Sequence, residues 1–473
     1  MTNLLTELQD YAETLVEQYQ IPAVSLAIWH KSQLYQAAAG TLNIETHVKA
    51  TTDSIFQIGS ITKVFTTCLV MQLVDEDRIN LDMPVLTYLR DFQVADIQAT
   101  RSITVRQLLN HTNGISGDYT DATQTEDNAI ARYVDRINLI PQVHEPGAQY
   151  SYSNTAFVVA GRLVEVTLGV PWQKAIEERI FKPLGMTHAI TDPRETLRHR
   201  AAMGHFSDAD NPQNWCLSST CYSKLGTALA PAGSVATMSA ADLITFSRAH
   251  LNKGKTATGE SWLSSNSIQL MQTPTVALPP TSEMVDQHCG LGWKITVNKH
   301  SGATMLSHNG LAAGQNAMLN LFPDQNIAFA VVFNGAKPGA FRAIHNHLIH
   351  ALLSMNVEEP EPLLKKKSTI ELSAYTGTYA SLENIYQIKF KEGSLKTNNY
   401  TLVMSHSDKL NNVIDQLSLL PLGGHLFAAY NNQGVRLLNV IFITNTGEAA
   451  PSQLFIGGRL NNRVHPIAPK QYN

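Results

Sequence analysis

The residues of this chain best suited to covalent chemistry are Ser60 and Lys63, which stand three positions apart where a long apolar run begins. On an α-helix, positions i and i+3 are neighbours with Cβ atoms about 5–6 Å apart, so the hydroxyl and the ammonium group share one face. A serine hydroxyl is a poor nucleophile at neutral pH and needs a neighbouring base. The spacing is therefore compatible with Ser60 as a nucleophile that Lys63 activates.

A purely structural explanation of the same pair competes with this one. Ser60 could cap a helix and Lys63 could extend to solvent, and for such a pair taken alone this is the more frequent outcome. Residues 64–74, however, are apolar on nearly every side, which indicates a helix buried all round. In addition, none of the other lysines has a serine three residues before it. Both observations favour the catalytic interpretation.

The elements around this pair follow from periodicity and turn residues. Apolar residues at helical spacing predict a first helix over residues 4–19, which Pro22 ends. Residues 23–29 and the segment after the turn at 30–33 predict a hairpin. A helical and loop-rich region is expected from about residue 84 to 260. Beyond Gly290 the pattern predicts strands at 291–295, 305–311, 317–322 and 327–333, then a helix at 339–355.

Three parts are expected along the 473 residues: a first domain at 1–355, a linker at 356–367 and a second domain at 368–473. The linker prediction rests on prolines and charges. In the last part, short apolar runs alternate with turn signals at close spacing, which is typical of a small antiparallel β-barrel or sandwich. The runs are residues 386–390, 402–404, 416–420, 426–430, 437–443 and 454–456.

Composition excludes several classes of function. The net charge is −4 and the hydrophobic content is 44%, so we expect a globular protein that binds neither nucleic acid nor a membrane. The start of the chain lacks a basic segment followed by an apolar one, and we expect a cytoplasmic protein. Zinc spacing is absent, and we expect neither a metal nor a cofactor. Cys216 and Cys221 leave a local disulfide open.

Two further motifs follow Ser60-x-x-Lys63 in the chain: Tyr152-x-Asn154 after a Pro-Gly turn, and a His-Asn-Gly triplet from His308 to Gly310 near a strand end. Together they resemble the family of class C β-lactamases, penicillin-binding carboxypeptidases, D-aminopeptidases and related esterases. The resemblance covers about residues 5–355 and extends to the neighbouring segments 58–60, 108–114, 146–154 and 290–293. Each motif alone is weak, but their order and neighbours are specific.

Two competing matches can be set aside by their positions. Tyr430-x-Asn432 lies beyond the linker, at a turn of the second domain. His300-x-Gly302 lies in a hairpin turn, whereas His308 falls near the end of a strand, where a substrate could lie.

The resemblance implies an α+β fold, in which an antiparallel sheet is flanked by helices with an inserted helical region. It also implies an acyl-enzyme on Ser60, with Lys63 and Tyr152 sharing one proton network that serves the nucleophile and the leaving group. Tyr152 would act as a phenolate, because a nearby ammonium lowers a phenol pKa from its reference near 10. Asn154 would orient Lys63 and the substrate amide.

The family places its oxyanion hole between two backbone N–H groups. In this chain these are expected to belong to Ser60 and to Leu311, the residue after the third motif at Gly310, and one such donor contributes about 3–4 kcal/mol. His308 stands where β-lactamases usually carry lysine. A neutral imidazole is a weaker partner for a β-lactam carboxylate, which favours the peptidases and esterases of the family.

The resemblance therefore implies a serine hydrolase that cleaves a peptide, a D-amino-acid amide or an ester. A carboxylesterase or weak β-lactamase on the same site is one alternative, and a non-catalytic ligand-binding relative is another. The segment 372–379 opens a domain that resembles the lipocalin-like barrel of some peptidases in this family. That barrel would cap the active site or mediate self-assembly into a homo-oligomer, and the sequence leaves both open.

Overall fold

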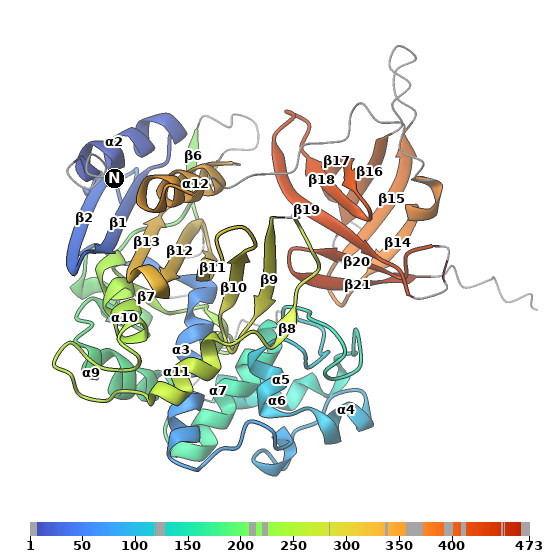
Figure 1. Cartoon of the computed structure of the whole chain (residues 1–473), viewed down its shortest axis with the longest axis horizontal. Coiled ribbons are helices and arrows are strands. Elements are labelled where there is room, and N and C mark those ends of the chain that lie inside the picture. The colour runs from blue at the N-terminus through green and yellow to red at the C-terminus, as the bar shows by residue number, and fades with distance from the viewer. Residues whose placement is uncertain are drawn as a thin grey trace, which may run out of the picture.

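A computed structural model describes residues 7–117, 119, 128–207, 214–219, 226–282, 284–335, 339–355, 372–391, 401–407, 413–445, 448 and 450–464. The predicted linker and Cys221 lie outside these residues, so the domain boundaries and the disulfide stay predictions. Two bodies are visible in Figure 1: a sheet with helices on both faces, and a barrel of strands.

The larger body is built on an eight-stranded antiparallel sheet in the order β2-β1-β13-β12-β11-β10-β9-β8. It confirms the predicted fold class. The predicted N-terminal hairpin forms its β2–β1 edge, while β8 and β9 were not predicted. The strands are β1 (Ala23–His30), β2 (Gln33–Gly40), β8 (Val276–Ala277), β9 (Val285–Cys289), β10 (Lys294–Asn298), β11 (Thr304–Ala312), β12 (Gln315–Phe322) and β13 (Ile327–Phe333).

Helices cover both faces of this sheet because its central strands are apolar on both sides. In β13 all seven residues are buried, and they alternate between two cores. Helices α2 (Leu8–Tyr19) and α12 (Ala340–Leu353) close one core, while α3 (Thr62–Asp75) and α10 (Ala240–Leu251) contribute to the other. This alternation is the period-2 pattern of a strand packed on both faces.

The inserted helical region lies below the sheet in Figure 1. Its longest helix is α7, which begins at Asn154 because the hydroxyl of Ser153 accepts a hydrogen bond from the backbone N–H of Ala156 at 3.1 Å. The helices of this region and its continuation, α7 included, are α4 (Ile97–Ser102), α5 (Val105–Leu109), α6 (Ala129–Arg136), α7 (Asn154–Leu168), α8 (Trp172–Ile176), α9 (Lys182–Leu184) and α11 (Ser265–Gln272).

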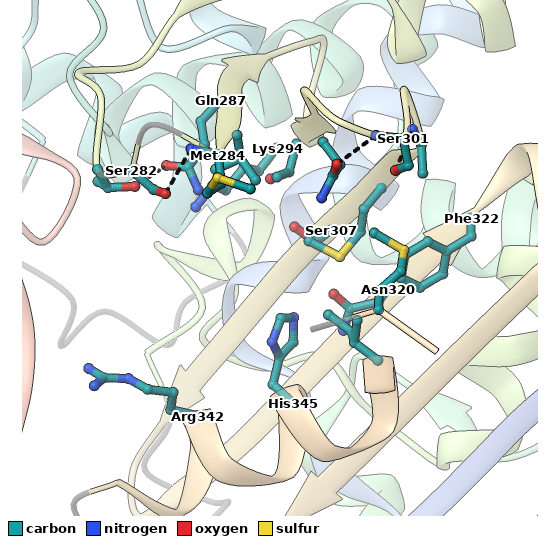
Figure 2. Close-up of a pocket in the computed structure, with 18 of the residues that line it drawn as sticks. Ser282, Met284, Gln287, Lys294, Ser301, Ser307, Asn320, Phe322, Arg342 and His345 are labelled. Carbon is teal, nitrogen blue, oxygen red and sulfur yellow. Dashed lines mark hydrogen bonds between the residues drawn. The ribbon is translucent and has the colours of Figure 1, made fainter. Parts of the chain in front are cut away.

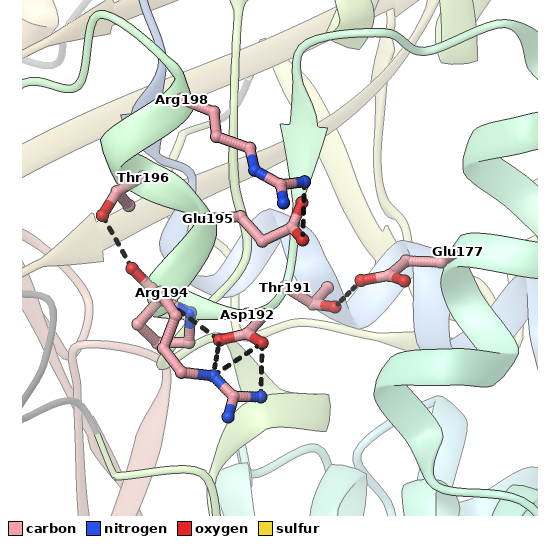
Figure 3. Close-up of polar contacts among 8 residues, drawn as sticks. Glu177, Thr191, Asp192, Arg194, Glu195, Thr196 and Arg198 are labelled. Atoms are coloured by element: carbon pink, nitrogen blue, oxygen red, sulfur yellow. Dashed lines mark hydrogen bonds and ion pairs between the residues drawn. The ribbon is translucent and has the colours of Figure 1, made fainter.

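A three-stranded sheet in the order β3-β7-β4 (Phe56–Gln57, Thr237–Met238, Ala189–Ile190) supports the chain entering the Ser60 turn. The segment after β4 is tied down by side chains (Figure 3). Thr191 donates to Glu177 at 2.7 Å, and Asp192 both caps the following turn and pairs with Arg194. These contacts hold the edge of the small sheet in place.

The second body is a closed barrel of eight antiparallel strands, as expected from the alternation of short apolar runs with turns. Tyr379, Phe427 and Phe442 belong to its core. Its strands are β14 (Gly377–Ala380), β15 (Ile385–Lys391), β16 (Thr401–Ser407), β17 (Val413–Gly423), β18 (Leu426–Tyr430), β19 (Arg436–Ile443), β20 (Gln453–Ile456) and β21 (Arg459–Val464).

Within the described residues, no single helix has the length and apolar composition of a membrane span. Taken together, the helices Asn154–Leu168 and Trp172–Leu184, which meet at a bend of 79°, pass the same test of length and composition.

Candidate active site

Ser60 lies on a short 3-10 turn (η1, Gly59–Ile61) that leads directly into α3. Eleven of the 14 residues of α3 are buried, as the uniformly apolar run predicts, and Lys63 is completely buried among them. Its ammonium group donates a hydrogen bond to the Ser60 hydroxyl at 3.0 Å and another to the carbonyl oxygen of Ala232 at 2.6 Å. Lys63 therefore does not extend to solvent, and it directly contacts the candidate nucleophile.

The strand β11 passes very close to the Ser60 turn, and two glycines make this approach feasible. A Cβ added at Gly310 would lie 1.8 Å from the carbonyl oxygen of Ile58. One added at Gly59 would lie 2.6 Å from the backbone nitrogen of Leu311. The backbone of Leu311 therefore lies against the residue that precedes Ser60, as a pair of oxyanion-binding N–H groups requires.

Tyr152 and Asn154 flank the N-cap of α7, so the start of that helix delivers both to the site. The Lys63 ammonium nitrogen lies 4.8 Å from the centre of the Tyr152 ring. The structure thus brings Ser60, Lys63 and Tyr152 together. Asn154 is the first residue of α7, and its role as an orienting group stays a prediction.

His308 lies on β11, with its ring centre 6.3 Å from that of Tyr152. Its Nδ1 is 2.8 Å from the carbonyl oxygen of Asn309, so Nδ1 carries the proton and donates it. Burial, reinforced by the positive charge of Lys63, lowers the pKa of His308 to about 3. The imidazole is therefore neutral at physiological pH, with Nε2 left as an acceptor.

His111 is a residue of the site whose function the sequence did not reveal. Its ring Nδ1 accepts a hydrogen bond from the backbone N–H of Ser153 at 3.0 Å, and its carbonyl oxygen accepts one from Ser151 at 2.9 Å. These bonds fix the chain on both sides of Tyr152, and the two rings lie 4.4 Å apart. Burial, and next the charge of Lys63, holds the His111 pKa well below its usual range. Segment 108–114 was part of the family resemblance in the sequence, but the resemblance assigned no role to His111.

The barrel also contributes to the site, through the tip of its β20–β21 hairpin. The carbonyl oxygen of Gly458 accepts a hydrogen bond from the backbone N–H of Tyr152 at 2.9 Å. The guanidinium carbon of Arg459 lies 4.9 Å from the centre of the Tyr152 ring. Tyr152 is thus flanked by two cations, one from each body, and the sequence pointed to only one of them.

An apolar cluster anchors this hairpin beside the site. Val143 packs with Ile441, Phe455 and Leu460 of the barrel. The backbone N–H of Leu460 donates to the hydroxyl of Ser151 at 3.2 Å, one residue before the tyrosine. Of the two roles left open for the barrel, this arrangement agrees with a cap on the active site, and self-assembly stays a prediction.

Within the part of the chain that the structure describes, no group of three or more His, Cys, Asp or Glu side chains could hold a metal ion.

The chain is similar to known proteins in sequence and in fold. The family model described as beta-lactamase matches residues 8–354. Penicillin-binding protein 4 of Amycolatopsis lactamdurans is 33% identical over 373 residues, which are 78% of this chain and 96% of that protein.

Two solved structures are also similar. The crystal structure of SurE superposes with a TM-score of 0.74 at 24% identity, over 97% of this chain and 99% of that one. A D-stereospecific amidohydrolase from a Streptomyces species has a TM-score of 0.56 at 27% identity, over 74% of this chain and 98% of its own. The chain belongs to the β-lactamase family, whose members of this type are serine hydrolases.

Proposed function

We propose that the protein hydrolyses peptides or D-amino acid amides through an acyl-enzyme on Ser60. The observation that carries this proposal is the 3.0 Å hydrogen bond between a fully buried lysine and the Ser60 hydroxyl. Burying an unpaired ammonium is costly, so a structural lysine would be expected to reach solvent or a carboxylate. Lys63 instead contacts the nucleophile.

In the proposed reaction, the Ser60 oxygen attacks the substrate carbonyl carbon. Lys63 stabilises the developing alkoxide through its hydrogen bond, and Tyr152 is the candidate acceptor for the serine proton. The backbone N–H groups of Ser60 and Leu311 receive the negative charge of the tetrahedral intermediate. The proton then passes to the leaving amine, and water attacks the acyl-enzyme to regenerate Ser60.

Two features support an amide or peptide substrate. The neutral His308 offers an acceptor where a β-lactamase usually presents a cation, which disfavours a β-lactam carboxylate at that position. Arg459 of the barrel places a positive charge near the Tyr152 ring, where it can pair with the free carboxylate of a peptide substrate. A relative named penicillin-binding protein and a neighbour named D-stereospecific amidohydrolase agree with this substrate class.

The proposal is tested by comparing three chromogenic substrates on the wild type and on Ser60→Ala. We expect turnover of D-alanyl p-nitroanilide, and slower turnover of p-nitrophenyl butyrate and of a chromogenic cephalosporin, all lost in the variant. Turnover of p-nitrophenyl butyrate alone would identify the protein as a carboxylesterase. Preference for the cephalosporin would identify it as a weak β-lactamase, and absence of all three activities would favour a ligand-binding protein.

A further inference from the structure

A cavity of about 730 Å³ lies on the opposite side of β11 from Ser60, between the sheet, α12 and strand β19 of the barrel (Figure 2). This volume lies within the range of small-molecule binding sites, about 300–1,000 Å³. Its floor is the outer face of β10, β11 and β12, and none of the catalytic groups described above lines it. The cavity is therefore separate from the candidate active site.

Asn320 is buried in the wall of this cavity without a partner. In β12 it falls between Met318 and Phe322, on the face where both neighbours pack into the apolar core under α12. Its exposed fraction is 0%, and neither Oδ1 nor Nδ2 has a hydrogen-bond partner among the described residues. Burying an unpaired amide is unfavourable by about 1–3 kcal/mol, so an asparagine at this position of an apolar row calls for a polar partner, which the adjoining cavity can supply.

The strand register places two more polar side chains beside Asn320. Ser307 of β11 is paired directly with Asn320 of β12, and Lys294 of β10 is paired directly with Ser307. Directly opposite residues on antiparallel strands have Cβ atoms about 4.5–5.5 Å apart and point to the same face. An ammonium, a hydroxyl and an amide thus form one continuous row across three strands, and all three line the cavity.

The charge of the cavity wall is one-sided. Among the described residues that line it, three are cationic, Lys294, Arg342 and Arg436, and none is acidic. Figure 2 shows Lys294 and Arg342 on opposite sides of the space, with His345 extending from α12 toward Asn320. A wall of this composition favours a negatively charged ligand.

The rest of the wall is apolar. Met305, Phe322, Phe341 and Ile349 lie around the polar row and could cover a hydrocarbon chain or an apolar side chain. The wall therefore requires three things of a ligand: an anionic group, an amide-like group with both a donor and an acceptor for Asn320, and an apolar body.

We propose that this cavity is a second binding site, for a small molecule that carries a carboxylate next to an amide on an apolar body. N-acyl amino acids and the free C-terminal ends of short apolar peptides both have this chemistry. The carboxylate would lie against Lys294 and Ser307, the amide would pair with Asn320, and the apolar part would lie against Phe322 and Ile349. This inference concerns binding only and does not depend on the proposed function.

The test is calorimetric titration of the full chain with two probes, N-decanoylglycine and N-acetyl-leucyl-leucyl-glycine. We expect at least one probe to bind at one site per chain. Tighter binding of N-decanoylglycine would identify the natural ligand as an N-acyl amino acid, and tighter binding of the tripeptide would identify it as a peptide. Asn320→Leu and Lys294→Met should each weaken binding by about tenfold or more, the effect of losing one buried polar or charged contact. The neutral amide N-decanoylglycinamide should bind more weakly than the acid.

Lys299→Met is the matched control. Lys299 lies in the turn between β10 and β11, pairs with Asp286 and does not line the cavity. It should leave the affinity unchanged. Asn320→Leu replaces an unpaired buried amide with an apolar group of similar size, so its thermal unfolding should be unchanged or shifted upward. The proposal is overturned if neither probe binds, if both bind with several copies per chain, or if Asn320→Leu and Lys294→Met bind as tightly as the wild type.

Discussion

Replacing Gly310 with alanine tests whether the close approach of β11 to the Ser60 turn matters for catalysis. The added Cβ would lie 1.8 Å from the carbonyl oxygen of Ile58, and Cβ atoms essentially never approach a heavy atom closer than 3.0 Å. The two backbones must therefore separate by about 1.2 Å, the difference between these distances. This movement carries the Leu311 N–H away from the Ser60 N–H.

Such a displacement should be far more harmful to the rate than to the fold. A misplacement of about 1 Å can lower a rate about 10²-fold, and loss of one oxyanion donor lowers kcat about 10²–10³-fold. Overpacking should lower the free energy of unfolding by only about 1–3 kcal/mol. We therefore expect Gly310→Ala to remain folded and to lose about 10²–10³-fold in kcat on D-alanyl p-nitroanilide.

Gly302→Ala provides the matched control for lost stability. Gly302 lies in the turn that leads into β11 and has φ +71°, but an added Cβ meets nothing within 4 Å. Alanine there should lower the free energy of unfolding by about 1–2 kcal/mol, because L-residues are strained in the left-handed region, while kcat stays unchanged. Full activity of a folded Gly310→Ala protein would refute this account of the oxyanion hole.

Three further changes probe other parts of the structure. Lys63→Met should lower kcat by about 10²–10⁴-fold without unfolding the protein, and a rate near that of the wild type would exclude the lysine from the proton network. Arg459→Met should raise KM by about tenfold for substrates with a free carboxylate, since a hydrogen bond to a charged group contributes about 1.5–3 kcal/mol. The KM of neutral esters should be unaffected. An equal rise in KM for carboxylate substrates and neutral esters would contradict a contact between Arg459 and the substrate carboxylate. Burial lowers the pKa of His250 from 6.5 to about 3. Between pH 6.5 and pH 3 the unfolded chain therefore binds one proton more at this histidine than the folded chain does. The free energy of unfolding then falls by about 1.4 kcal/mol per pH unit as the pH drops below 6.5. Denaturant unfolding of His250→Leu should show a shallower dependence in this window, and an unchanged slope would contradict it.

Much of the fold was predictable because periodicity reports burial directly. The uniformly apolar run after Ser60 became a buried helix, and the apolar runs near 317 and 327 became the inner strands β12 and β13. The strand β9 (Val285–Cys289) was not predicted, because its three middle residues, Asp286, Gln287 and His288, are polar and none of them is buried. Its pairing with β10 depends on tertiary neighbours that the local sequence does not show.

The candidate site shows the same limit. Ser60, Lys63 and Tyr152 were predicted together because each belongs to a motif, and the structure brings them into one cluster. Arg459 was not predicted, because it follows a Gly-Gly turn more than 300 residues from Tyr152 and nothing in its local sequence indicates a site. Only the docking of the barrel hairpin brings it to the tyrosine.

The same contrast applies to Asn320. In the sequence it is one polar residue in a strand, which an exposed edge would explain. The structure shows instead that it is fully buried, and that the register aligns it with Ser307 and Lys294. Register is a property of two strands at once, so a single run of residues cannot reveal it.

The central claim is that Ser60 is the residue that becomes acylated. The most direct measurement is mass spectrometry of the protein quenched in acid during turnover of p-nitrophenyl butyrate, followed by peptide mapping of the modified chain. The account predicts one added butyryl group per chain on the peptide that contains Ser60, and no such adduct in Ser60→Ala. An adduct on another residue, or equal labelling of the variant, would contradict it.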